Sequence, residues 1–455
     1  MRYAIPQLEL TPVVSETPRK KAWTNGDANK LSLEDRPAHA WYRFVLSYPP
    51  HLVRDYLNRY GNGEQHTVLD PFCGTGTTLV ECKKLGVPSA GIEMHPMSHF
   101  ATTVKVDWHP DPDGLIDHAQ GIAEKVSRKL QADGVEDNST LFLRETSPTT
   151  YGKSSLRSLD AESEKLLLTN SISPLPLHKT LVVLEVLQNN TDERFHRHEL
   201  LAFAKALVFS ISNLNFGPEV GVGQIKADAP VLAPWLENIY EMADGLRTLR
   251  DRDATTATAY RGDSRERLNL LMPNSIDAVI TSPPYPNEKD YTRTTRLESV
   301  LLGFIHNRAE LQTLKHGLIR SNTRNVYKHD NDDQWVSEFP EIQRIAAEIE
   351  ARRIELGKTS GFERLYARVT KLYFGGMARH LAELRTILRP GANLAYVVGD
   401  QASYLRVMIR TGQILASIAE ALGYQVQGID LFRTRLATAT KEQLREEVLV
   451  LRWNG

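Results

Sequence analysis

The pentapeptide Thr-Ser-Pro-Pro-Tyr at 281–285 combines groups that can act on a flat ring bearing an amino group. Pro283 and Pro284 each fix φ and remove a backbone N–H donor, so they stiffen the chain. Carbonyl oxygens and the Ser282 hydroxyl can accept the protons of an amine, and the Tyr285 ring can stack on a heterocycle. The apolar run at 276–280 before it predicts a buried strand. We therefore predict a rigid shelf at the carboxyl end of a strand; the alternative interpretation is a Pro-rich loop after a core strand.

The glycine-containing segment at 70–78, Asp-Pro-Phe-Cys-Gly-Thr-Gly-Thr-Thr, is the second candidate site. It follows a strand predicted at 67–70 and opens a helix, so its glycines permit close approach of a ligand to helix N–H groups. No Lys-Ser or Lys-Thr follows, as a nucleotide-hydrolase phosphate loop requires, and Leu79 replaces the third glycine of the dinucleotide fingerprint. The predicted cofactor-binding residues here are Asp70, Pro71, Phe72, Cys73, Gly74, Gly76, Thr77 and Thr78.

Three carboxylates at predicted strand ends complete this cofactor site. Asp70 can pair with a ligand ammonium, Glu93 can accept two ribose hydroxyls, and Asp263 can accept an adenine amine. A ligand with ammonium, carboxylate and ribose but no phosphate is S-adenosylmethionine, with its carboxylate at the helix N-terminus. For Glu93 and Asp263 the alternative is a surface carboxylate at the end of a strand. The strand, glycine loop, helix and next strand predict a doubly wound α/β fold.

Taken together, these motifs resemble those of the amino-group DNA methyltransferases, and Ser-Pro-Pro-Tyr is most typical of the members that modify cytosine N4. The resemblance covers the α/β core, about half of the chain. It implies a seven-stranded, mostly parallel class I (Rossmann-like) methyltransferase sheet with a last antiparallel strand, and methyl transfer from S-adenosylmethionine. By the same resemblance, Tyr-Pro-Pro at 48–50 covers the methionine end of the cofactor, and Arg-Pro-Gly at 389–391 and Val-Val-Gly-Asp at 397–400 match later motifs. Many members have their two halves in permuted order, whereas here the cofactor half comes first.

The resemblance implies that methyl transfer takes place at the shelf. Its catalytic residues would be Ser282, Pro283, Pro284 and Tyr285. The Ser282 hydroxyl and the Pro283 carbonyl would accept the amine protons of a base that has left the duplex, and Tyr285 would stack on it. Methylation at cytosine C5 needs a thiolate, usually from a Pro-Cys pair. Neither Cys73, after Phe72, nor Cys82, after Glu81, fits that pattern.

Bulk properties restrict the class of protein. The chain has 455 residues, 41% of them hydrophobic and 24% charged, and a net charge of −1, so DNA binding requires a local basic patch. Its two cysteines have no metal-ligand spacing, and we expect no metal. No apolar stretch is long enough to span a membrane, and no secretory signal opens the chain. We expect an intracellular, cytoplasmic and prokaryotic protein.

We predict six segments along the chain. They are an N-terminal arm (1–38), the cofactor half of the core (39–100), a mainly helical insertion (101–255), core with the catalytic motif (256–285), a second insertion (286–360) and the remainder of the core (361–455). Within the first insertion, the polar stretch at 133–160 is a candidate loop. A helix ending near Leu388 and a strand at 393–398 are expected late in the chain.

The second insertion carries the best basic stretch, with five Lys or Arg and one acid between Asn307 and His329. Since phosphate contacts need Lys or Arg, this insertion is the candidate DNA-recognition element; the alternative is a solvated helical face. The predicted nucleic-acid contacts are Arg293, Arg296, Lys315, Arg320, Arg324 and Lys328.

Several functions remain open at this point. The leading one is a cytosine-N4 methyltransferase acting on double-stranded DNA, with a restriction endonuclease as a possible separate partner, and adenine N6 is the nearest variant. An RNA guanine-N2 methyltransferase usually carries an RNA-binding domain ahead of the cofactor loop, and only 69 residues precede Asp70. A non-catalytic nucleic-acid-binding subunit would not need Asp70, Glu93, Ser282 and Tyr285. A nicotinamide oxidoreductase lacks its third glycine here.

Overall fold

The main sheet lies at the centre of the protein. The computed structural model describes residues 31–42, 47–60, 66–137, 156–217, 219–266, 270–286, 289–436 and 443–455. The strands of the sheet are β1 (Val68–Asp70), β2 (Ser89–Glu93), β5 (Ala257–Arg261), β6 (Ile276–Thr281), β7 (Leu388–Gly399), β8 (Gln425–Leu436) and β9 (Gln443–Arg452). Their order is β5-β2-β1-β6-β7-β9-β8. The last strand in the sequence, β9, is antiparallel to β7 and β8, and the other pairs are parallel. The predicted seven-stranded class I methyltransferase sheet is therefore confirmed.

Both faces of this sheet are buried, as alternation along β7 shows. Ala395 and Val397 pack into a cluster with α2, whereas Leu394, Tyr396 and Val398 pack into a cluster with α14 and α15. Because successive side chains of a strand point to opposite faces, an uninterrupted apolar run is what a sheet covered on both sides requires.

The helices of the α/β core cover these two faces. They are α1 (Arg36–His39), α2 (Pro50–Tyr60), α3 (Thr77–Lys84), α4 (Pro96–Lys105), α14 (Tyr366–Leu384) and α15 (Thr411–Ala421). The residues expected on the inner face of α2, at 52, 53, 56 and 57, are all buried. Gly86 follows α3 with a φ of +75°, so it ends that helix as predicted. Asp35 and Ala38 are buried as well, and packed chain therefore begins inside the predicted arm, of which residues 1–30 lie outside the described residues.

The first insertion lies between β2 and β5 and packs against the core. Its elements are α5 (Pro112–Ala132), α6 (Ala161–Leu166), α7 (Pro174–Asn189), α8 (His196–Ala206), the π-helix η1 (Leu207–Ile211), β3 (Leu214–Phe216), β4 (Val220–Val222), α9 (Leu232–Leu249) and the 3₁₀ turn η2 (Arg250–Arg252). The prediction of a mainly helical segment missed the β3–β4 hairpin, which forms in its glycine-rich connection. The predicted start of the insertion, residue 101, falls inside α4, which continues to Lys105. Residues 138–155 of the candidate loop at 133–160 lie outside the described residues.

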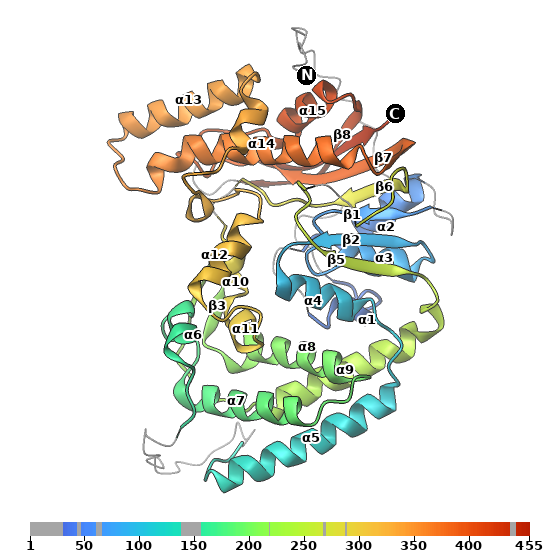
Figure 1. Ribbon diagram of the computed structural model, residues 1–455, viewed down its shortest axis with the longest axis vertical. Coiled ribbons are helices and arrows are strands. Elements are labelled where there is room, and N and C mark those ends of the chain that lie inside the picture. Colours follow the sequence, from blue (N-terminus) through green and yellow to red (C-terminus); the bar gives the residue numbers. More distant parts are fainter. Residues whose placement is uncertain are drawn as a thin grey trace.

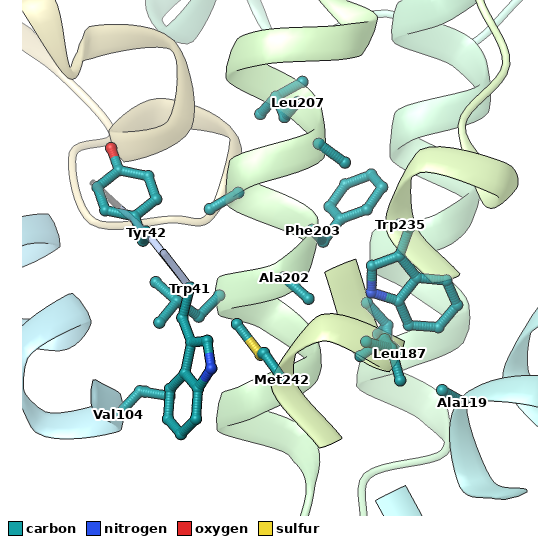
Figure 2. Close-up of a cluster of buried hydrophobic side chains, with 14 of the residues drawn as sticks. Trp41, Tyr42, Val104, Ala119, Leu187, Ala202, Phe203, Leu207, Trp235 and Met242 are labelled. Atoms are coloured by element: carbon teal, nitrogen blue, oxygen red, sulfur yellow. The ribbon is translucent and has the colours of Figure 1, made fainter. Parts of the chain in front are cut away.

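One hydrophobic cluster joins this insertion to the core (Figure 2). Trp41 and Val104 come from the core, and Phe203, Trp235 and Met242 come from the insertion, yet all belong to the same buried cluster. The fit is close, because a Cβ added to Gly245 of α9 would lie 2.7 Å from Nε1 of Trp41. The insertion is thus fixed to the core by packing rather than attached through a linker.

The second insertion joins β6 to α14. It contains α10 (Tyr291–Thr294), α11 (Arg296–Leu301), α12 (Arg308–His316), η3 (Thr323–Asn325), η4 (Asp332–Val336), α13 (Pro340–Glu355) and η5 (Glu363–Leu365). Figure 1 shows α13, α14 and α15 at one end of the molecule, the sheet in the middle, and α5, α7, α8 and α9 at the other end. None of the described helices is long and apolar enough to cross a membrane.

One predicted boundary was wrong. We expected a helix that reaches Leu388, but α14 ends at Leu384, and Leu388 is already the first residue of β7. Leu388 pairs with Ile276, and the next paired residue of β7 is Asn393, opposite Ala278, so the Arg-Pro-Gly segment at 389–391 loops out within the strand. A proline lacks the N–H that the ladder needs, which explains the irregularity.

Candidate active site at the carboxyl edge of the sheet

A cavity of about 500 Å³ opens at the carboxyl ends of the parallel strands. Its wall includes segments that follow β1, β2, β5, β6 and β7, and open α/β sheets bind ligands at this edge. The sheet thereby brings together motifs that are far apart in the sequence. The predicted residues on the wall are Pro71, Phe72, Cys73, Gly74, Thr77, Glu93, Asp263, Ser282, Pro283, Pro284 and Tyr285.

The glycine loop forms one side of the cavity and is held from behind. Gly74 and Gly76 have φ of +53° and +86°, a region that favours glycine, and a Cβ on Gly76 would lie 2.9 Å from Cγ2 of Thr102. From α4, Thr102 Oγ1 donates to the Gly74 carbonyl at 2.7 Å, and Lys105 Nζ donates to the Thr75 carbonyl at 2.7 Å. These bonds fix the shape of the loop and leave its cavity side to a ligand.

Glu93 lies at the end of β2, beside this loop. Its Oε2 accepts from the Gly74 N–H at 2.8 Å and its Oε1 from the His95 N–H at 2.7 Å. Burial raises the pKa of Glu93 from 4.5 to about 7, although these backbone hydrogen bonds oppose the rise. Each oxygen keeps a further lone pair, so the carboxylate can accept two more hydroxyl donors.

Three residues predicted to bind the cofactor, Asp70, Gly76 and Thr78, are absent from the cavity wall. Asp70 is completely buried. Its Oδ1 accepts from Thr281 Oγ1 at 2.6 Å and from the Phe72 N–H at 3.1 Å, and its Oδ2 accepts from the Tyr48 hydroxyl at 2.9 Å.

This placement puts Asp70 behind the cavity wall, and its pairing with a ligand ammonium stays a prediction. Its carboxylate accepts hydrogen bonds from donors within the protein. These bonds join the glycine loop, the end of β6 and the segment that carries Tyr48. Tyr48 is also hydrogen-bonded to Thr78 and lies on the cavity wall, so Asp70 shapes the site from behind.

The shelf at 282–285 lies on the cavity wall next to β7. The Ser282 hydroxyl donates to the Val397 carbonyl at 3.2 Å, which uses its hydrogen and leaves oxygen lone pairs as acceptors. The Tyr285 ring packs against Gly399, where an added Cβ would lie 3.1 Å from Cε2 of the ring. The neighbouring strand therefore orients both side chains.

Asp263 is on the cavity wall, but its carboxylate already has a partner. Nε and Nη2 of Arg265 donate to Oδ1 and Oδ2 of Asp263 at 3.0 and 2.6 Å. Nη1 of Arg265 donates to Oδ2 of Asp332 in η4 at 2.6 Å, so this buried arginine joins the edge of the cavity to the second insertion. The contact of Asp263 with an adenine amine stays a prediction.

The six basic residues predicted to contact nucleic acid differ in their exposure and in their partners. Arg296 donates to the carbonyls of Thr292 and Leu166, Lys315 pairs with Asp290, and Arg320 pairs with Asp330; these three are engaged inside the protein. Arg293 is half-buried, and Arg324 and Lys328 are exposed. Phosphate contact is retained as a proposal for Arg324 and Lys328 alone, because a surface phosphate needs a cation that can reach it.

Several residues on the cavity wall were not predicted from the sequence. They are Met94, His95, Lys289, Tyr291, Gly317, Leu318, Ile319, Ser321, Asn325, Gln401 and Ser403, among others. Gly317 touches Met94 so closely that an added Cβ would lie 2.5 Å from the methionine Cε, and the second insertion thus roofs the cavity near Glu93. Residues directly after a strand are candidates for the cavity wall, and this rule would have selected His95 and Gln401. No sequence signal identifies the residues of the second insertion that cover the cavity.

Comparison with known proteins agrees with this geometry. Residues 12–101 match the family model of N6 and N4 enzymes described as DNA methylase. M.BsoBI, a type II methyltransferase of Geobacillus stearothermophilus, is 24% identical over 434 residues, which cover 90% of this chain and 83% of the relative. M.AvaI, a type II methyltransferase of Nostoc sp., is 24% identical over 454 residues, covering 92% of this chain and 87% of the relative. M.MjaII of Methanocaldococcus jannaschii is 35% identical over 78 residues, 17% of this chain and 14% of the relative.

These matches agree with the fold. The family match includes the glycine loop and Glu93, and the two long matches run along most of the chain. The methyl donor that this family implies is S-adenosylmethionine. The family model and the two long matches support the amino-group (N6/N4) family of DNA methyltransferases.

Proposed function

We propose that this chain transfers a methyl group from S-adenosylmethionine to the exocyclic N4 amine of a cytosine that has been extruded from duplex DNA. The observation that carries the proposal is the arrangement of Ser282. Its oxygen lies in the same cavity as Glu93 and the glycine loop, and its hydrogen is directed at the Val397 carbonyl. A serine hydroxyl held in this way is an acceptor for an amine proton.

The residues of the glycine loop and of β2 suit the proposed cofactor. Glu93 offers carboxylate lone pairs to two ribose hydroxyls, and the first N–H groups of α3, which no side chain caps, suit a carboxylate. His95, on the same cavity wall, adds a buried ring atom, Nδ1, that has no hydrogen-bond partner among the described residues. When bound, the cofactor would supply an electrophilic methyl group on a sulfonium.

The shelf would then act on the base. The exocyclic amine is a weak nucleophile because its lone pair is delocalised into the ring. Hydrogen bonds from its two N–H groups to the Ser282 hydroxyl and the Pro283 carbonyl would favour a tetrahedral nitrogen whose lone pair is available for attack. Methyl transfer would leave S-adenosylhomocysteine, and the methylated nitrogen would release one proton to solvent. Tyr285 would stack on the base and keep it in place, so the contribution of the protein is position and electrostatics.

We also propose that this activity is of type II, because M.BsoBI and M.AvaI, the two relatives with long matches, are named type II methyltransferases. A separate restriction endonuclease that recognises the same sequence would then be the partner of this chain. The serine at position 282, in place of an aspartate, supports cytosine over adenine as the target.

The test is a methyl-transfer reaction with labelled S-adenosylmethionine and duplex DNA of mixed sequence, followed by digestion to nucleosides and mass spectrometry. The proposal predicts N4-methylcytosine. N6-methyladenine would keep the family and the mechanism but overturn the base assignment. Transfer to RNA and not to DNA would overturn the proposed substrate.

A further inference from the structure

Three residues on the cavity wall each carry a buried side-chain atom that, within the described part of the chain, has no hydrogen-bond partner. These atoms are Nδ1 of His95, Oδ1 of Asn325 and Nε2 of Gln401. Buried polar groups in native proteins are nearly always paired, because an unpaired one costs free energy. Unpaired groups that line a ligand cavity are therefore candidates for pairing with the ligand.

Two of these residues, His95 and Gln401, lie on different sides of the cavity. His95 follows β2, beside Glu93, and belongs to the cofactor side of the cavity. Gln401 follows β7, which lies next to β6 on the side away from β1 and β2. The β6 shelf therefore lies between the glycine loop and Gln401, and this places Gln401 on the side of the cavity that the target base would enter.

The backbone holds Gln401 in place before any ligand binds. Its N–H donates to the Ile409 carbonyl at 3.0 Å, and the Ile409 N–H donates to the Gln401 carbonyl at 2.7 Å. These two bonds form an isolated bridge, and the side chain is only 3% exposed. A fixed, buried amide donor is a typical device for reading the edge of a base by hydrogen bonding.

We propose that Gln401 reads the target base by donating a hydrogen bond from Nε2 to the ring nitrogen beside the exocyclic amine, N3 of cytosine. This inference rests on the proposed function. The Watson–Crick edge of cytosine presents the amine as a donor, and N3 and O2 as acceptors. Ser282 and Pro283 accept from the amine, and Gln401 supplies the donor that the neighbouring acceptor needs.

An unpaired donor has a measurable consequence in the free protein. Replacement of an unpaired buried donor by an apolar side chain of similar shape is neutral or stabilising, whereas replacement of a structural hydrogen-bond donor is destabilising. Gln401→Met should therefore leave the melting temperature unchanged or raise it while it removes the contact to the base. A residue with a merely structural role would show the opposite change in melting temperature.

The experiment compares wild type, Gln401→Met and Gln401→Glu, with Gln413→Glu on the exposed side of α15 as the matched control. Methyl transfer to unmethylated DNA of mixed sequence gives kcat and KM for DNA, calorimetry gives the Kd of S-adenosylhomocysteine, and a thermal melt gives stability. We expect both Gln401 variants to lower kcat/KM for DNA by about 10- to 100-fold with an unchanged Kd, and Gln413→Glu to match wild type.

Two results would overturn the inference. One is a wild-type rate in Gln401→Met, and the other is a parallel loss of melting temperature and cofactor affinity in both Gln401 variants, which would make the residue structural. Failure of the proposed function has a different signature. In that case wild type and Gln413→Glu would both produce no N4-methylcytosine, whatever residue stands at position 401, and the inference would fall with it.

Discussion

Cofactor affinity should depend on pH through Glu93. Burial raises the pKa of this carboxyl from 4.5 to about 7, so much of it is protonated just below neutral pH. Because the pKa in the folded chain is raised, the contribution of this carboxyl to stability is fully present below its unfolded pKa of 4.5 and is lost as the pH rises to about 7. The ionised form that accepts ribose hydroxyls appears around pH 7, at the upper end of this interval, so cofactor affinity should rise where that stability contribution has been lost.

The magnitude follows from the pKa. If the ribose hydroxyls bind the ionised carboxylate, the Kd scales with the reciprocal of the ionised fraction. With a pKa of about 7, the Kd should increase about tenfold between pH 8 and pH 6, which corresponds to about 1.4 kcal/mol. His95 and His380 do not contribute in this range, because burial lowers their pKa values to about 3 and about 4.

The assay is calorimetric titration with S-adenosylhomocysteine between pH 6 and pH 8. Glu93→Gln carries no charge at any pH, so its Kd should be weaker and independent of pH. Glu298 supplies a matched control, because burial raises its pKa to about 7 as well, yet it is hydrogen-bonded to Tyr42 and is not part of the cavity wall. Glu298→Gln should keep the wild-type slope. A flat wild-type profile, or an equal slope in Glu93→Gln, would refute this reasoning.

Three further substitutions test other parts of the structure. Ser282→Ala should lower turnover in a labelled methyl-transfer assay by about 100-fold and leave the Kd of S-adenosylhomocysteine unchanged; full turnover would refute the mechanism. Gly375→Ala would place a Cβ 1.8 Å from the Asp332 carbonyl oxygen, so a thermal melt should show a loss of about 1–3 kcal/mol, and an unchanged melt would contradict this contact. Arg265→Leu removes the ion pair of Asp263 and leaves buried Asp332 with Arg379 at 3.4 Å, so it should cost about 3–5 kcal/mol in denaturant unfolding. The exposed control Arg344→Leu on α13 should cost less than about 1 kcal/mol, and equal costs would argue against the role of Arg265.

Local patterns in the sequence predicted the core of the fold. The glycine loop, the helix that ends at Gly86 and the strand that ends at Thr281 all lie where short-range rules placed them, because turns, caps and apolar runs depend on neighbouring residues. The seven strands and the antiparallel last strand were predicted from the resemblance to a family. Neither source predicted the β3–β4 hairpin, which is short and isolated.

The roles of individual polar residues were harder to predict, because partners come from distant segments. Asp70 has the expected position at the end of β1, but Thr281 and Tyr48 occupy its oxygens. Arg320 belongs to a basic stretch in the sequence, but it is buried against Asp330. Composition counts charges without showing which of them are neutralised by contacts in the folded chain.

The methylated base can be identified in living cells. DNA would be isolated from a methylation-deficient bacterial host that expresses either wild type or Ser282→Ala, and its modified nucleosides would be quantified by mass spectrometry. We expect N4-methylcytosine with wild type and almost none with Ser282→Ala. N6-methyladenine, or equal methylation by the two proteins, would contradict the proposed function of the shelf.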